Sequence, residues 1–206
     1  MPKKNEDLHG CTPDKSVVAL LLIDVINDLD FPEADELLAH AVPMARQVAA
    51  LTKRAKQTGI PVVYVNDNFG RWRSDFKAQV DHCLQDGVRG KPVVELLRPA
   101  DDDYFVLKPK HSGFFSTALD TLLEYLGVET VILAGIATNI CVLFAANDAY
   151  MWDFYIVVPS DCVASNSEDE NRHALEQMRK VLKADTRPSS ELSFEAGFPR
   201  RSGRGH

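Results

Sequence analysis

The stretch VVALLLID, residues 17–24, decides the fold, because an unbroken run of apolar and mostly branched residues ends there in an aspartate. Further apolar runs of the same kind follow at residues 61–65, 104–107, 130–134 and 154–158. Continuous apolar character, without alternation, is typical of strands that are covered on both faces of a parallel sheet. The runs therefore predict a parallel sheet at the centre of the protein.

Longer amphipathic stretches separate these runs and predict helices. The first covers residues 35–57, in which Pro43 indicates a kink or the start of a second helix. Helices are also expected at residues 117–126 and 168–182, and a short final strand at residues 184–187. Strands that alternate with helices imply right-handed βαβ units. The expected fold class is α/β, a three-layer α/β/α sandwich.

The domain organisation follows from length and local composition. A chain of 206 residues suggests one large domain, which we place at residues 16–188. Residues 1–15 are charged and lack periodicity, which predicts a flexible N-terminal tail. Residues 189–206 are expected to form a C-terminal extension that is partly disordered. The less regular stretch 72–90 is expected to cover the active-site face.

Composition excludes several partners and settings. The net charge of -7 disfavours non-specific binding to nucleic acid and to anionic membranes. No apolar run approaches the roughly 20 residues that a membrane-spanning helix needs, and the N-terminus lacks the apolar core of a secretory signal. The four cysteines lie far apart and form no CxxC pair. We expect a cytoplasmic protein with no nucleic-acid or membrane partner.

Three reactive side chains follow apolar runs of the predicted sheet. Asp24 follows the first run and Lys108 follows the run at 104–107, while Cys141 lies shortly after the run at 130–134. In an open parallel sheet the ligand crevice lies beyond the carboxyl ends of the strands. An acid, an ammonium and a thiol are therefore expected to converge on one edge of the sheet.

Each of the three also has an explanation without catalysis. A strand-end aspartate often caps a loop or a helix, and a cysteine among apolar residues is usually a small buried side chain. Lys108 is the strongest indication, because a lysine that ends an apolar strand is rarely there for packing. Together the three residues favour thiol chemistry over their separate structural roles.

The chemistry of such a trio is that of a thiol-dependent hydrolase. A helix is expected over residues 139–151, with Val142, Ala145, Ala146 and Ala149 facing inward, so that Cys141 lies in its first turn. The helix dipole and the Lys108 ammonium are expected to lower the pKa of the thiol. Asp24 can accept the thiol proton and deliver it to a leaving amine. Gly135 permits a tight turn whose amides could form an oxyanion hole.

With these residues, the sequence resembles the isochorismatase-like cysteine hydrolases, which include nicotinamidases and N-carbamoyl amidohydrolases. The likeness covers about residues 16–184. The motif LLLID matches the segment that ends in the family's catalytic aspartate, here Asp24. The motif KPKHSGF matches the family's lysine, here Lys108, and AGIATNICV matches the nucleophile segment and assigns Cys141.

The resemblance implies a Rossmann-like, six-stranded parallel sheet in a homo-oligomer. It implies a non-proline cis peptide bond, here Ile136–Ala137, which would aim the amides of Ala137 and Cys141 at the developing oxyanion. It also implies a thioester intermediate that water hydrolyses. Metal-dependent nicotinamidases of the family have an Asp-x-His ligand pair after the second strand, whereas residues 66–72 contain no histidine. We therefore expect neither a metal nor another cofactor.

The substrate is open, and a small molecule with an amide or carbamoyl C–N bond is the leading class. Four side chains are candidates for substrate contacts, against structural roles in loop capping or the core: Asn27, Asn66, Asn68 and Trp72. One alternative activity is the hydrolysis of a vinyl ether, as in true isochorismatases, which do not need the thiol. Another alternative is a binding protein that has kept the fold but lost catalysis.

A phosphoryl-transfer protein is a weaker alternative. Haloacid-dehalogenase-like enzymes need a second aspartate two residues after the first, and Ile26 stands there. A phosphatase loop would need an arginine about six residues after its cysteine, where Asn147 stands.

Overall fold

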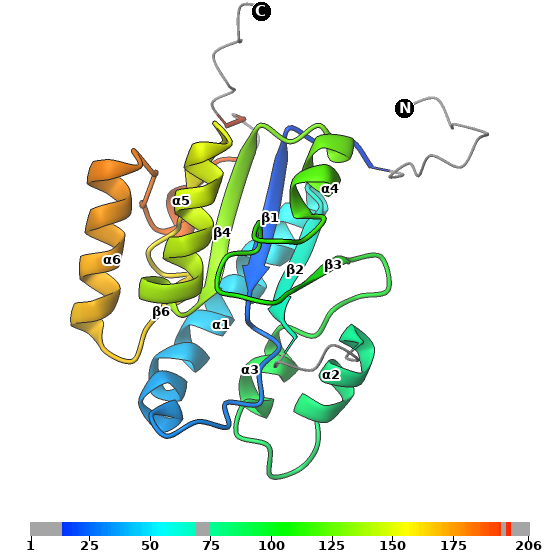
Figure 1. Cartoon of the computed structure of the whole chain (residues 1–206), viewed down its shortest axis with the longest axis vertical. Helices are drawn as coiled ribbons and strands as arrows, with labels where there is room; N and C mark the ends of the chain where they lie inside the picture. Colours follow the sequence, from blue (N-terminus) through cyan, green and yellow to red (C-terminus); the bar gives the residue numbers. More distant parts are fainter. Residues whose placement is uncertain (1–13, 69–74, 195–196, 199–206) are drawn as a thin grey trace, which may run out of the picture.

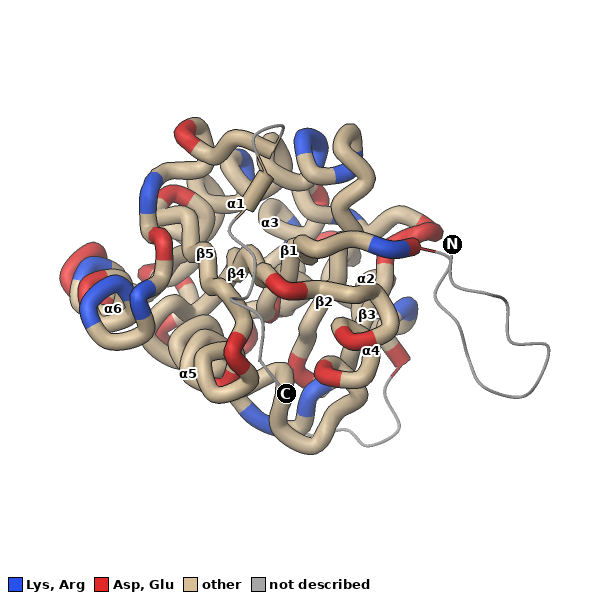
Figure 2. The backbone as a smooth tube through the Cα atoms, turned by 90° about the horizontal axis from the view of Figure 1, so that it is seen from above, with Lys and Arg blue, Asp and Glu red and all other residues tan. Residues whose placement is uncertain are grey.

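The computed structural model describes residues 14–68, 75–194 and 197–198. A parallel sheet forms the centre, in the order β3-β2-β1-β4-β5, with β6 paired to β4 (Figure 1, and Figure 2 for β5). Its strands are β1 (Val18–Ile23), β2 (Val62–Asp67), β3 (Tyr104–Lys108), β4 (Thr130–Ile136), β5 (Tyr155–Val157) and β6 (Val163–Ala164). The expected α/β sandwich with a six-stranded parallel sheet is confirmed.

Helices cover both faces of the sheet. One face carries α1 (Ala34–Gln57), α2 (Phe76–Cys83) and α3 (Lys91–Leu96), and the other carries α4 (Leu119–Leu126), α5 (Leu143–Met151) and α6 (Glu168–Val181). Along β1, Leu20 and Leu22 pack against the first set of helices, whereas Leu21 and Ile23 pack against the second. Every residue of β1 is buried, which explains why its sequence shows no polar alternation.

Three local predictions are wrong or incomplete. Helix α1 continues through Pro43, so this proline does not begin a second helix. The expected strand at 184–187 is reduced to a single bridge between Val157 and Asp185. Strand β6 was not predicted, because two residues are too few to show a periodicity.

Strands β5 and β6 both pair with β4, at different points along its length. Strand β5 pairs with Thr130–Ile132 in the first half of β4, and β6 pairs with Gly135 and Ile136 at its end. The chain between them leaves the sheet and returns, and the amide of Gly135 donates to the carbonyl of Cys162 there. This return holds the end of β4, from which the segment with Cys141 departs.

The ends of the described chain pack onto the domain. The Asp14 carboxylate accepts a hydrogen bond from the Tyr104 hydroxyl at 2.5 Å. At the other end, a 3-10 turn at Ser189–Glu191 precedes Leu192, which is buried. The Arg54 guanidinium donates to the carbonyls of Ser189 and Leu192. The first part of the expected C-terminal extension therefore contacts α1, while residues 1–13 lie outside the described chain.

Charge is spread over the outside of the molecule. In Figure 2 the outer helix α6 carries both acidic and basic residues. Its ion pairs join Arg172 to Asp169 and Lys180 to Glu176. Among the helices of the described chain, none combines the length and apolar character needed to cross a membrane.

Candidate active site

The three reactive side chains meet at the carboxyl ends of the strands. The Lys108 ammonium lies 2.9 Å from a carboxylate oxygen of Asp24 and 3.7 Å from the Cys141 sulfur. Lys108 is fully buried and Asp24 is 5% exposed, whereas Cys141 is partly exposed. Residues that are far apart in sequence thus form one compact cluster, of which Cys141 is the most exposed member.

The Asp24 carboxylate is held from two directions. Its Oδ2 faces Lys108, and its Oδ1 accepts a hydrogen bond from the amide of Asp67 at 2.7 Å. The backbone of Asp24 has a φ of 52°, a left-handed conformation that aspartate tolerates better than most other residues. The chain therefore turns at the end of β1 and presents this carboxylate to the neighbouring strands.

Gly135 allows the ends of β1 and β4 to approach closely. It is the register partner of Ile23, directly before Asp24. A Cβ atom there would lie 2.1 Å from the carbonyl oxygen of Ile23, and the φ of Gly135 is 118°. The peptide bond between Ile136 and Ala137, which follows closely, is cis. The family resemblance had implied a cis bond at this position.

Cys141, the candidate nucleophile, lies in a π-helical turn, Thr138–Val142, that leads into α5. The Val142 amide donates to the Ala137 carbonyl at 3.2 Å, and single π-turns of this kind are frequent at functional sites. The predicted inward face of the following helix is confirmed, because Val142, Ala145, Ala146 and Ala149 are all buried. The expected α-helical start at residue 139 is corrected to this wider turn.

Two side-chain hydrogen bonds connect the turn Thr138–Val142 to neighbouring elements. The Thr138 hydroxyl donates to the Asn171 side-chain oxygen at 2.5 Å, and the Ser165 hydroxyl donates to the Asn139 side-chain oxygen at 2.9 Å. Thr138 and Ser165 are almost completely buried. The turn that carries Cys141 is therefore fixed to the start of α6 and to the end of β6.

The electrostatics of the cluster correct one expectation. Burial, and next the negative charge of Asp24, raise the pKa of the Cys141 thiol to about 12, and the opposing effect of Lys108 is smaller. Burial likewise raises the pKa of Asp24, against the lowering effect of Lys108. For Lys108, burial lowers the pKa, but the charges of Asp24, Cys141 and Asp67 together outweigh it, and the pKa is raised. The pKa of the Cys141 thiol is therefore raised, whereas the sequence had suggested a lowered thiol pKa.

The chain matches a known protein family over most of its length. The model of the isochorismatase domain matches residues 18–186, which is most of the chain. The chain belongs to the isochorismatase family. It is a hydrolase of that family, as the sequence motifs had indicated.

Relatives of this isochorismatase-family hydrolase include amidohydrolases. An uncharacterized isochorismatase family protein, YaaI of Bacillus subtilis, is 41% identical over 86% of this chain and 97% of its own length. Maleamate amidohydrolase of Pseudomonas putida is 32% identical over 73% of this chain and 74% of its own. The crystal structure of N-carbamoylsarcosine amidase from Thermoplasma acidophilum superposes with a TM-score of 0.65 at 29% identity, covering 86% of this chain and 99% of that one.

The side chains that were predicted to contact the substrate lie in different environments in this hydrolase. Asn66 is fully buried, and its side chain exchanges hydrogen bonds with the backbone of Ile26 at 3.4 and 2.5 Å. The Asn27 side chain accepts from the Leu29 amide at 2.8 Å, and Asn68 is 8% exposed. Trp72 lies outside the described residues. The amide of Asn66 thus joins the ends of β1 and β2 within the protein.

Two residues at the site were not singled out from the sequence. The Asp67 carboxylate lies 3.7 Å from the Lys108 ammonium, since Asp67 and Lys108 are register partners on neighbouring strands. The His111 Nδ1 lies 3.9 Å from the Cys141 sulfur. Strand-end position could have identified Asp67, and proximity to Lys108 in the motif KPKHSGF could have identified His111.

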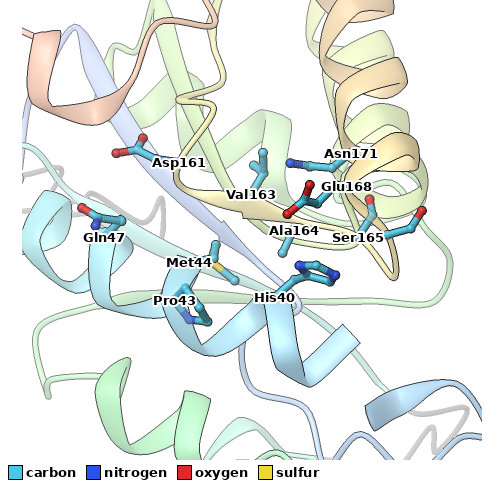
Figure 3. Close-up of a pocket in the computed structure, with 11 residues that line it drawn as sticks. His40, Pro43, Met44, Gln47, Asp161, Val163, Ala164, Ser165, Glu168 and Asn171 are labelled. Carbon is cyan, nitrogen blue, oxygen red and sulfur yellow. The ribbon is translucent and has the colours of Figure 1, made fainter. Parts of the chain in front are cut away.

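A cavity of about 350 Å³ lies on the α1 side of the nucleophile turn. Figure 3 shows its walls, with His40, Pro43 and Met44 from α1 opposite Ala164 and Glu168. None of Asp24, Lys108 and Cys141 lines it. It touches the active site only indirectly, because Ser165 and Asn171 line the cavity and bind the turn.

Proposed function

We propose that this chain hydrolyses an amide or carbamoyl C–N bond of a small molecule through a thioester on Cys141. The observation that carries this proposal is the contact of one buried ammonium, that of Lys108, with both the Asp24 carboxylate and the Cys141 sulfur. A buried lysine with a carboxylate on one side and a thiol on the other suits proton transfer and charge stabilisation better than packing.

In the first half of the reaction, Asp24 takes the proton of the Cys141 thiol as the sulfur attacks the carbonyl carbon of the substrate. The raised pKa of Asp24 makes it a better proton acceptor, and the resting thiol has a proton to give. Lys108 stabilises the negative charge that passes between the sulfur and the carboxylate. The oxyanion is held by the amides of Ala137 and Cys141.

The C–N bond then breaks as Asp24 delivers the proton to the leaving nitrogen. Ammonia or an amine departs, and the acyl group remains on Cys141 as a thioester. Water attacks the thioester carbon, the C–S bond breaks, and the carboxylic or carbamic acid leaves. Retention of this thiol cluster favours a C–N bond over a vinyl ether, and amidohydrolases such as maleamate amidohydrolase among the relatives support the same class.

The test is release of ammonia from a panel of small amides, ureido acids and nicotinamide, followed by mass spectrometry of Cys141. We expect Cys141→Ala to reduce turnover by several orders of magnitude while leaving the unfolding temperature nearly unchanged. Acid quenching of the wild-type protein during turnover should trap the acyl group on Cys141.

The matched control is Cys83→Ala, which removes a buried thiol from α2. It should cost some stability through the cavity it leaves and should keep the turnover number. Equal activity of Cys141→Ala and the wild type would contradict the proposal, as would a trapped acyl group on another residue.

A further inference from the structure

The Cys141 sulfur has two chemically different sides. On its buried side lie Asp24 and Lys108, which are 5% and 0% exposed. On the other side lies the exposed imidazole of His111, whose Nδ1 is 3.9 Å from the sulfur. The proton transfers described above occupy the buried side and leave His111 without a role.

The position of His111 is set by its neighbours. It comes three residues after Lys108, in the loop that leaves β3. Its ring packs against Phe144 of α5, with 5.3 Å between the ring centroids. The next residue, Ser112, is buried and accepts a hydrogen bond from the Phe114 amide through its hydroxyl. The ring is therefore held beside the sulfur although it is exposed to solvent.

We propose that His111 is a further catalytic residue, the general base that activates water for hydrolysis of the Cys141 thioester. This inference rests on the thioester route proposed above. Water has to approach the thioester from the exposed side, because Asp24 and Lys108 close the buried side. A base that reaches the acylated sulfur from that side can hold this water within hydrogen-bond distance.

The protons of this second half-reaction balance. The imidazole of His111 takes one proton from the attacking water, and the hydroxide oxygen forms its bond to the acyl carbon. The C–S bond breaks and returns its electron pair to the sulfur of Cys141. His111 then gives its proton to that sulfur, which restores the thiol and the neutral imidazole. Asp24 has already lost its proton to the leaving nitrogen and is ready for the next turnover.

The test uses p-nitrophenyl acetate as an acyl donor, because it reports acylation and deacylation separately. Release of p-nitrophenolate in the first turnover measures transfer of the acetyl group to Cys141, and the later steady rate measures its hydrolysis. The variant is His111→Phe, which keeps an aromatic ring beside Phe144 and removes both ring nitrogens. The control is Lys110→Gln in the same loop, also at an exposed residue.

We expect His111→Phe to acylate at close to the wild-type rate and to deacylate about 100-fold more slowly, at the lower end of the usual range for a general base. Acetylated Cys141 should accumulate and be visible by mass spectrometry. Hydroxylamine, a nucleophile that needs less help from a base, should restore release of the acetyl group. Lys110→Gln should behave like the wild type in both phases.

Two other results would overturn the inference in distinguishable ways. If His111→Phe deacylates at the wild-type rate, or slows acylation instead, His111 is not the base for hydrolysis while the thioester route still stands. If the wild-type protein transfers no acetyl group to Cys141, the thioester route fails and the role of His111 fails with it.

Discussion

The candidate catalytic cluster and the cavity between α1 and α6 are both connected to the turn Thr138–Val142, the cavity only through Ser165 and Asn171, but they differ in what they offer a ligand. In the cluster, the Lys108 ammonium lies 2.9 Å from Asp24 and 3.7 Å from the Cys141 sulfur, and the pKa of each of the three groups is shifted. The cavity offers about 350 Å³, yet its Ser165 and Asn171 already bind other parts of the protein. A group of titratable side chains that shift one another's pKa is therefore a better indication of a reactive site than the volume of a cavity.

The largest effect that separates the two regions is expected for Asp24→Asn. Asparagine also tolerates the left-handed backbone at this position, so the shape of the site is retained. Loss of the proposed general base should reduce amide turnover by about 10²–10⁴-fold. The negative charge of Asp24 also raises the pKa of Cys141, so its removal should lower that pKa. Iodoacetamide should then alkylate Cys141 faster in the variant than in the wild type at the same pH.

This opposite response of turnover and alkylation is the informative outcome. A thiol that is merely buried would show no gain in alkylation when Asp24 is replaced. Alkylation rates are measured by mass spectrometry between about pH 6 and pH 10. Because this range lies below the raised wild-type thiol pKa of about 12, a lowered thiol pKa in the variant appears as faster alkylation at each pH. An unchanged or slower alkylation in Asp24→Asn would mean that this carboxylate does not control the sulfur.

The longer strands of the sheet were predictable because they are covered on both faces. The runs at 17–23 and 61–65 carry that property in their composition alone, and β1 and β2 lie there. Strand β6 was not predictable, since it is defined by pairing with the end of β4 and not by its own two residues. Pro43 does not begin a second helix, because helix α1 buries residues on both sides of it and tertiary packing overrides local preference.

The three candidate catalytic residues, Asp24, Lys108 and Cys141, were predictable, but their electrostatics were not. Position at a strand end identified Asp24 and Lys108, because parallel strands bring their carboxyl ends to one edge. The direction of the Cys141 pKa depends on burial and on the distance to Asp24, which only the folded chain determines. The approach of His111 to the sulfur also depends on how the loop after β3 packs on α5.

Lys108→Met is expected to have the next largest effect, on stability as well as on activity. It leaves the buried Asp24 carboxylate without its cation, which typically costs about 3–5 kcal/mol. Without Lys108, the folded pKa of Asp24 is raised further above its unfolded value of about 3.9. A raised folded pKa favours the folded state below the unfolded pKa, and this contribution is lost as the pH rises through the folded pKa.

The stability deficit of Lys108→Met should therefore be smaller near about pH 4 than near about pH 8, as measured by urea unfolding. The double variant Asp24→Asn/Lys108→Met removes the unpaired carboxylate and should regain much of the loss at the higher pH. A deficit that does not change with pH, and that the double variant does not relieve, would assign the cost to packing of the lysine chain.

The smallest effects on turnover and stability are expected for substitutions in the cavity. Two residues that line it are compared. Asn171→Ala removes the acceptor of the buried Thr138 hydroxyl, which should cost about 1–3 kcal/mol of stability and reduce turnover a few-fold through the turn that carries Cys141. Gln47→Ala trims an exposed residue on the opposite wall and should change neither. Steady-state kinetics and thermal unfolding of both variants test whether the cavity takes part in substrate binding. A large rise in KM for Gln47→Ala would make the cavity part of the substrate site, because that side chain touches the cavity but not the nucleophile turn.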